Sequence, residues 1–217
     1  MLQMMREVGL RMMARSMRMS IMPAEESAFY THERWRNWIA RVRESGFTLD
    51  DGLNSSGEVF VCMEDDVILA CLKIIAKYEM GVLTREDAIS KLDEVRSVVL
   101  GKIEPISDDI DMMLSSLQMS LVAVMAACEC YINSDYTDDR TPADLIKAAV
   151  NAEAEEKIEL ALHNIAKIGA RMIGDSLRLE DSLTENVPDG MVAEWLDGLD
   201  SLSAAMVGED SYKRDDK

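Results

Sequence analysis

The 217-residue chain has few of the side chains that catalytic and metal sites usually require. It contains two His and four Cys, and the Cys residues show no C-x-x-C spacing. Neither the glycine-rich nucleotide-binding motifs nor the G-x-S-x-G hydrolase motif occurs. So few Cys in a chain of this length form no disulfide framework, which favours a reducing, cytoplasmic environment. The sequence carries no signature of a particular reaction and implies no cofactor.

Positive charge and long hydrophobic runs are also scarce. Lys and Arg number 23 against 41 Asp and Glu, which gives a net charge of −18. Because nucleic-acid phosphates are bound by clustered Lys and Arg, this balance argues against direct nucleic-acid binding. No stretch approaches the roughly 18 uninterrupted apolar residues of a membrane helix, so we expect no membrane span. An apolar content of 48% is nevertheless enough to build a packed core.

Residues 1–22 differ from the rest of the chain. They hold eight of the seventeen Met, and four Arg against one Glu give them a net charge of +3, whereas the remaining 195 residues carry −21. The Arg residues interrupt the apolar stretch that a secretory signal requires. Three interpretations stay open: a basic surface arm that docks on the acidic body as an extra helix, a membrane-surface or targeting segment, and a start-site artefact.

Residues 23–185 are predicted to form one all-α, bundle-like domain, within a total of six or seven helices. Pro23 marks the start of the first helix, because Pro lacks the N–H that a helix leaves unpaired at its first position. An apolar stripe at helical spacing follows from Trp35 to Val42, and Gly46 ends the helix.

The next stretch is predicted to change from extended chain to helix. The segment EVFVCM at 58–63 is interpreted as an extended lead-in. Glu64 to Asp66 are interpreted as the acidic start of a helix, where carboxylates meet the positive end of the helix dipole. Thr84 and Ser107 are favourable N-cap residues and predict two further helix starts.

A very apolar helix at the centre of the core is predicted over about 108–132. Glu129 is the only charge after its acidic first turn, and interspersed Ser and Gln favour a core helix over a membrane helix. Thr141 as N-cap and Pro142 at the first helical position predict another start. The apolar spacing that follows predicts one long helix over about 142–179.

The C-terminal region is predicted to contain a helix detached from the domain, over 186–206, followed by a polar tail at 207–217. Short helices are marginal in water unless an apolar face is covered. We therefore expect this helix to pack on its own bundle or on a second chain, and favour a homodimer through it. The apolar face consists of Val192, Trp195, Leu196, Leu199 and Leu202.

Two groups of side chains offer weak candidate chemistry. Glu159 and His163 lie four residues apart on one helix face and, with Glu155, are the best candidates for a metal or small-molecule site. The Glu-x-x-His spacing of di-metal bundles is absent, so an exposed Glu–His pair is the simpler interpretation. Cys128 and Cys130 are candidates for a redox pair, although residues two apart on a helix point about 200° apart. Buried Cys usually behaves as a small hydrophobe.

Three stretches of the sequence resemble one family: ERWRNWIARVRESGF at 33–47, MEDDVILACLKII at 63–75 and SLQMSLVAVMAACECYI at 116–132. Over about residues 25–185 the chain is similar to a family of small acidic helical proteins of archaea, chiefly methanogens, known only as a domain of unknown function. The resemblance implies an archaeal, cytoplasmic origin and carries over no catalytic residues.

The leading functional hypothesis is a non-enzymatic interaction or assembly protein that docks on a larger complex or on itself. The alternatives are a metal- or small-molecule-binding helical bundle, with or without enzymatic activity, and a thiol redox sensor. Trp is favoured at binding hot spots, although ordinary core packing is the alternative explanation at each position. The candidate partner-binding residues are Trp35, Trp38, Trp195, Leu196 and Leu199.

Overall fold

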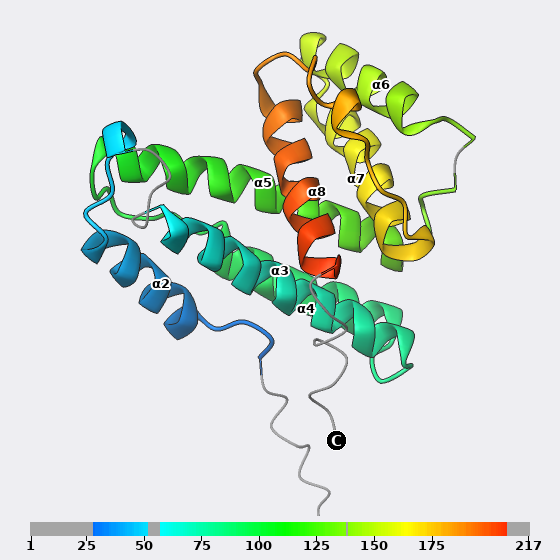
Figure 1. Ribbon diagram of the computed structural model, residues 1–217. Helices are drawn as coiled ribbons and strands as arrows, with labels where there is room; N and C mark the ends of the chain where they lie inside the picture. The colour runs from blue at the N-terminus through cyan, green and yellow to red at the C-terminus, as the bar shows by residue number, and fades with distance from the viewer. Residues whose placement is uncertain (1–27, 52–56, 138, 208–217) are drawn as a thin grey trace, which may run out of the picture.

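The computed structural model describes residues 28–51, 57–137 and 139–207. The regular secondary structure of this part of the protein consists of seven α-helices and two short 3₁₀ turns, with no strand (Figure 1), so the all-α prediction is confirmed. The Met- and Arg-rich segment 1–22, Pro23 and nearly all of the predicted polar tail lie outside the described residues. The elements are α2 (His32–Glu44), η1 (Leu49–Asp51), α3 (Glu58–Glu79), α4 (Arg85–Val99), α5 (Asp108–Ile132), α6 (Pro142–Ala154), α7 (Ile158–Asp175), η2 (Asp181–Leu183) and α8 (Met191–Val207).

Helix α5 is the centre of the fold, and its predicted bounds are confirmed. Helices α3 and α4 pack against it in one group that α2 completes, while α7 and α8 pack against it in a second group that α6 completes (Figure 1). In the described part of the chain, α5 is the one helix long and apolar enough to cross a membrane. Half of its most apolar stretch is buried inside the molecule, which is the environment of a core helix.

Three predicted helix starts are confirmed by their capping hydrogen bonds. The side chains of Thr84, Ser107 and Thr141 each accept a hydrogen bond from the backbone N–H three residues later. At Thr84 and Thr141 an Asp at the third helical position accepts a bond from the cap's own N–H, which completes a capping box. Gly46 follows α2 with φ at +62°, the left-handed conformation predicted for it.

One predicted helix start near the N-terminus is wrong, and the helix that carries the Trp35 to Val42 stripe is shorter than predicted over the described residues. Helix α2 begins at His32, after an N-cap hydrogen bond to Thr31, and residues 28–31 are not helical. Helix α3 begins at Glu58, so the EVFVCM segment is its first turn and a half rather than an extended lead-in. Phe60, Met63 and Val67 explain this, because they are buried at helical spacing in the core.

The long helix predicted over 142–179 is also wrong, because two helices occupy this stretch. Helix α6 ends at Ala154, Glu156 takes a left-handed conformation with φ at +58°, and α7 starts at Ile158. A left-handed residue other than Gly costs roughly 1 kcal/mol. The reversal lets α6 pack alongside α7 and bury the apolar faces of both helices, which offsets that cost. Both helices have apolar residues at the same helical spacing, so the apolar pattern of the sequence does not reveal the break between them.

The C-terminal helix α8 is not detached from the domain, which corrects a further prediction. It packs on α5 and α7 of its own chain, and every residue of the apolar face predicted for a dimer is buried there. A Cβ added at Gly198 would lie 2.8 Å from the Ser120 carbonyl carbon and closer still to its oxygen, so the two backbones are in contact. The Glu153 carboxylate accepts a 2.6 Å hydrogen bond from the Met191 N–H and caps the first turn. The face that motivated a homodimer is therefore already covered.

Candidate functional site

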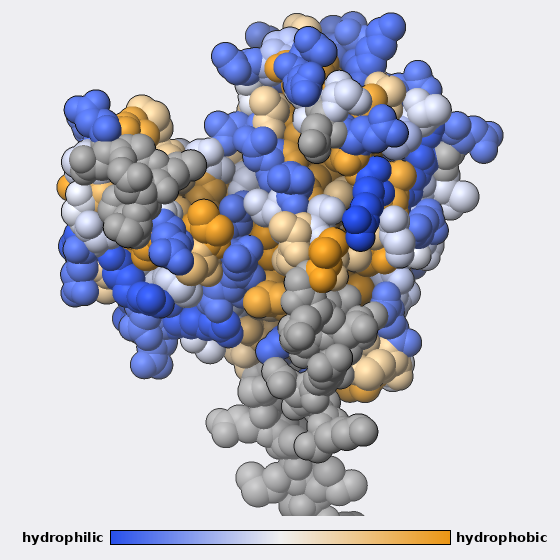
Figure 2. All heavy atoms as spheres, viewed as in Figure 1, coloured by the Kyte–Doolittle hydropathy of each residue, from blue (hydrophilic) through white to orange (hydrophobic). Residues whose placement is uncertain are grey.

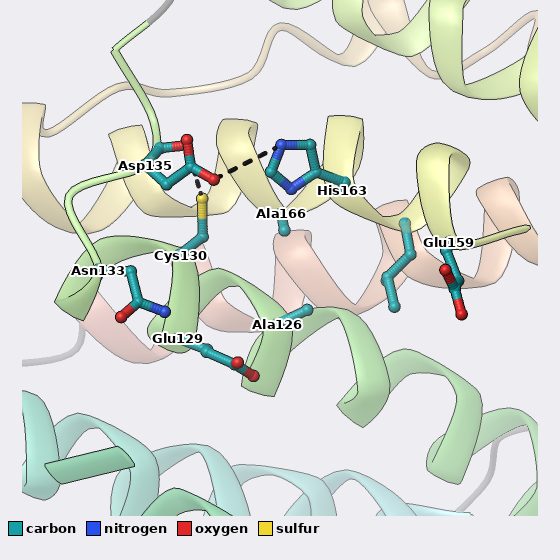
Figure 3. A pocket seen from close by; sticks show the side chains of 9 residues that line it. Ala126, Glu129, Cys130, Asn133, Asp135, Glu159, His163 and Ala166 are labelled. Atoms are coloured by element: carbon teal, nitrogen blue, oxygen red, sulfur yellow. Dashed lines mark hydrogen bonds and ion pairs between the residues drawn. The ribbon is translucent and has the colours of Figure 1, made fainter. Parts of the chain in front are cut away.

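Three of the sequence candidates, Cys130 on α5 and Glu159 and His163 on α7, line one pocket of about 280 Å³ between these helices, here called the α5–α7 pocket (Figure 3). Its floor is formed by small and branched apolar side chains, and a thiol, an imidazole and carboxylates surround it. Its lining consists of Ala126, Glu129, Cys130, Asn133, Asp135, Glu159, Leu162, His163 and Ala166.

The loop after α5 forms one wall of this pocket. The Cys130 thiol donates a hydrogen bond to the Asp135 carbonyl oxygen at 3.2 Å, and His163 Nε2 lies 3.7 Å from Asp135 Oδ2. Arg171 on α7 holds the loop, because its guanidinium donates to the Tyr136 carbonyl at 3.2 Å and to the Arg140 carbonyl at 2.7 Å. The position of Asp135 is therefore set by contacts from both helices.

The Cys130 thiol in this pocket is poorly suited to nucleophilic chemistry. Burial, followed by the negative charge of Asp135, raises the pKa of Cys130 to about 11. A thiol with such a pKa stays protonated at neutral pH, and the thiolate is the reactive form. The pocket therefore offers a binding surface with a hydrogen-bonded thiol rather than an activated nucleophile.

The metal-site hypothesis from the sequence is only partly assembled by the fold. Glu159 and His163 both line the α5–α7 pocket, but Glu155 lies at the turn after α6, where its carboxylate pairs with Lys157 Nζ at 2.6 Å. Figure 3 shows Glu159 lying apart from the Asp135 and His163 pair. Among the residues that the structure describes, no three His, Cys, Asp or Glu side chains gather at metal-binding spacing.

Cys128 and Cys130 point into different parts of the protein. Cys128 is fully buried in the main core, where a hydrogen bond with Cys71 and then burial raise its pKa. Cys130 instead packs with Ala166 and Ala170 beside the α5–α7 pocket. Because the two side chains diverge around α5, a bond between them would require the helix to unwind.

The candidate partner-binding residues lie mostly in the core. Trp35 and Trp195 are 6% and 2% exposed, and Leu196 and Leu199 are buried beside α5 and α7. Trp38 alone is partly exposed; its indole N–H donates to Asp66 Oδ2 at 2.7 Å, and the Arg41 guanidinium lies 4.3 Å from its ring centre. An apolar stripe has the same spacing whether it faces the core or a partner, so the sequence could not show that these residues are buried in the core.

A second hollow, which the sequence did not indicate, lies where the segment before α8 runs beside that helix. This α8 groove has Leu179 and Leu196 in its lining, and its other walls are mainly acidic. Burial, followed by the charges of Glu194 and Asp200, raises the pKa of Asp197. The carboxylates lining the groove are those of Glu180, Glu185, Asp197 and Asp200.

Glu64 is a partly buried acid, predicted from the sequence to start a helix that in fact begins at Glu58. It lies in the second turn of α3 and accepts hydrogen bonds from the Ser120 and Ser201 hydroxyls, of α5 and α8 respectively. Burial, partly opposed by these two bonds, raises the pKa of Glu64, and the charges of Asp65 and Asp197 raise it further. Glu64 therefore links three helices at a site where its negative charge is unfavourable.

We expect Glu64→Gln to raise the melting temperature at pH 7 and to change it little at pH 4. The pKa of Glu64 is higher in the folded protein than in the unfolded chain, so its bound proton stabilises the fold. That stabilisation is complete below the ordinary value of 4.5 and is lost as the pH rises through the folded pKa. Gln stays neutral at every pH and keeps an oxygen for the Ser hydroxyls.

Thermal unfolding of both proteins from pH 4 to pH 8 measures this difference. Glu44→Gln, on the exposed surface of α2, makes the same chemical change and serves as the control. A difference in melting temperature that does not depend on pH would show that the charge of Glu64 is not its cause.

The fold and these hollows define an acidic, all-α protein built around one central helix. The chain belongs to the family DUF2150, described as an uncharacterised protein conserved in archaea, whose model matches residues 28–215. The family resemblance recognised in the sequence is thereby confirmed. No curated protein and no solved structure matches the chain.

Proposed function

We propose that this protein is a non-enzymatic interaction protein of the archaeal cytoplasm, and that it binds a basic segment of a partner protein in the α8 groove. The observation that carries the proposal is the charge of this region. Four carboxylates line one groove, and no Lys or Arg occurs anywhere between Leu179 and Val207. Carboxylates gathered on one short segment repel one another, and a basic ligand relieves that repulsion.

The apolar part of the groove supports a protein ligand over a small inorganic cation. Lys and Arg side chains carry apolar stems that pack on hydrophobic surface while their charged ends stay in water. In the α8 groove such a stem would lie on the partly exposed Leu179, with the charged end near Asp197 and Asp200. Electrostatic attraction of this kind chiefly speeds association and sets specificity, so binding should weaken as salt is added.

We expect the double variant Asp197→Asn/Asp200→Asn to bind a basic peptide about tenfold more weakly, a loss of about 1.4 kcal/mol. The substitutions remove two of the four charges that line the groove and keep side-chain size. The measurement is fluorescence anisotropy with a labelled peptide of alternating Lys and Ser, at low salt and again at 0.5 M salt.

The matched control is Glu44→Gln/Glu104→Gln, which removes two exposed charges far from this segment in the sequence. It changes the net charge by the same amount, so any effect of overall charge would appear in both double variants. Equal affinities for the two variants would show that the peptide responds to net charge alone, and the proposal would fail.

A further inference from the structure

A third hollow, of about 330 Å³, lies between the N-terminal half of α5 and the first turn of α8. One stripe of α5 lines it at helical spacing, and α8 supplies the opposite wall; we call it the methionine groove. Met112 is 59% exposed, although most large apolar side chains of the described chain are buried. Figure 2 shows hydrophilic residues over most of this face of the molecule, with apolar surface gathered around α8 in the hollow between the two helix groups. The lining residues are Met112, Ser115, Ser116, Met119, Gly190, Met191 and Glu194.

The surroundings of the methionine groove are acidic. Glu194 lines it and accepts a hydrogen bond from the Ser116 hydroxyl, and Glu153 caps the adjoining first turn of α8. Asp108 and Asp111 stand one turn before Met112 and Ser115 along α5. Neither α5 nor α8 contains a Lys or Arg. An occupant therefore meets three Met side chains and two Ser side chains bordered by carboxylates, with no cation from either helix.

We infer that the methionine groove binds an amphipathic helix of a partner protein, with an apolar face turned to the Met side chains and Lys or Arg on its flanks. The inference rests on the proposed function and adds that the basic partner presents an amphipathic helix to this second groove. Met112 and Met119 stand two helical turns apart on α5, with Ser115 and Ser116 between them and Met191 of α8 on the opposite wall. That span matches apolar anchors at positions i and i+7 of a partner helix. Methionine side chains are flexible and polarizable, and they adapt to anchors of different shape.

Charge argues against a second copy of this protein as the occupant. Two copies meeting at this groove would bring the acidic borders of one together with those of the other, and like charges across an interface are unfavourable. A basic helix instead pairs with Asp108, Asp111 and Glu194 at the edges of the groove. The apolar face of the inferred helix thus contacts the Met side chains, and its Lys or Arg residues pair with the carboxylates around the groove.

Two labelled probes of equal charge test the inference. The first is a 14-residue peptide of Lys and Leu, with Leu at helical spacing; the second replaces every Leu with Ser. We expect the Leu peptide to bind the full-length protein at least tenfold more tightly than the Ser peptide. Met112→Glu should abolish that advantage, because it places a charge between the Met side chains, and should not weaken binding of the Ser peptide. Met80→Glu is the matched control, since Met80 is 56% exposed at the end of α3.

The outcomes separate this inference from the proposed function. If both peptides bind equally and Asp197→Asn/Asp200→Asn weakens both, the methionine groove is not a binding site and the proposed function stands. If neither peptide binds, both proposals fail. If light scattering shows a dimer that Met112→Glu converts to a monomer, a second copy occupies the groove and the inference is overturned. Circular dichroism of each variant confirms that the helices are retained.

Discussion

Replacing Gly198 with Ala is expected to lower the free energy of unfolding by about 3 kcal/mol. The new Cβ would lie 2.8 Å from the Ser120 carbonyl carbon, closer than real Cβ atoms come to a backbone atom. The obstacle is the backbone of α5 rather than a flexible side chain, so α8 must move as a unit to make room. Ala is favoured over Gly inside a helix by about 1 kcal/mol, which recovers only part of this loss.

Urea unfolding followed by circular dichroism measures the effect of Gly198→Ala. Gly101→Ala is the matched control, because a Cβ there meets only ordinary contacts at 3.5 Å. We expect the control to change stability by less than about 0.5 kcal/mol, as is usual away from packed sites. A Gly198→Ala protein as stable as the wild type would show that α8 does not pack against Ser120 in solution.

Trp195→Ala is expected to cost about 3–5 kcal/mol of stability, the range for removing a large aromatic side chain from a core. Trp195 is 2% exposed and lies among the residues of α8 that face the centre of the fold. Truncation to Ala leaves a cavity that the surrounding helices close only in part. The expected result is a lower midpoint of urea unfolding with little change in the slope.

Trp195→Phe is the informative companion variant. The indole Nε1 of Trp195 is buried and has no hydrogen-bond partner among the described residues, so Phe removes an unsatisfied donor while it keeps an aromatic ring. We therefore expect Trp195→Phe to cost less than about 1.5 kcal/mol. Equal losses in the two variants would indicate that the indole N–H makes a bond that the structure does not contain.

Both stability predictions bear on the proposed binding sites, because α8 forms a wall of the α8 groove and of the methionine groove. A displacement of α8 by the Gly198→Ala substitution changes the spacing of both hollows. Peptide affinity should therefore fall in this variant even where the protein remains folded. Gly198 thus connects the packing of the core with the shape of the surface.

The sequence by itself determined the elements whose signals are local. Capping residues predicted the starts of α4, α5 and α6, because an N-cap hydrogen bond spans only three residues. The apolar run of α5 predicted the central helix at its observed bounds, since burial on most sides requires apolar residues on most sides. The two-residue spacing of Cys128 and Cys130 already implied that their thiols diverge.

Tertiary packing alone decided the break between α6 and α7, the docking of α8 and the position of every hollow. The left-handed turn at Glu156 is unfavourable locally and persists because two apolar faces are buried against each other. The contact of Gly198 with Ser120 joins residues 78 positions apart, and the α5–α7 pocket joins Cys130 to His163 across two helices. An apolar stripe shows that a face must be covered, but its spacing does not identify the covering segment. Which segment covers the face depends on which surfaces of the whole chain fit together. The grooves therefore form only when the helices are packed.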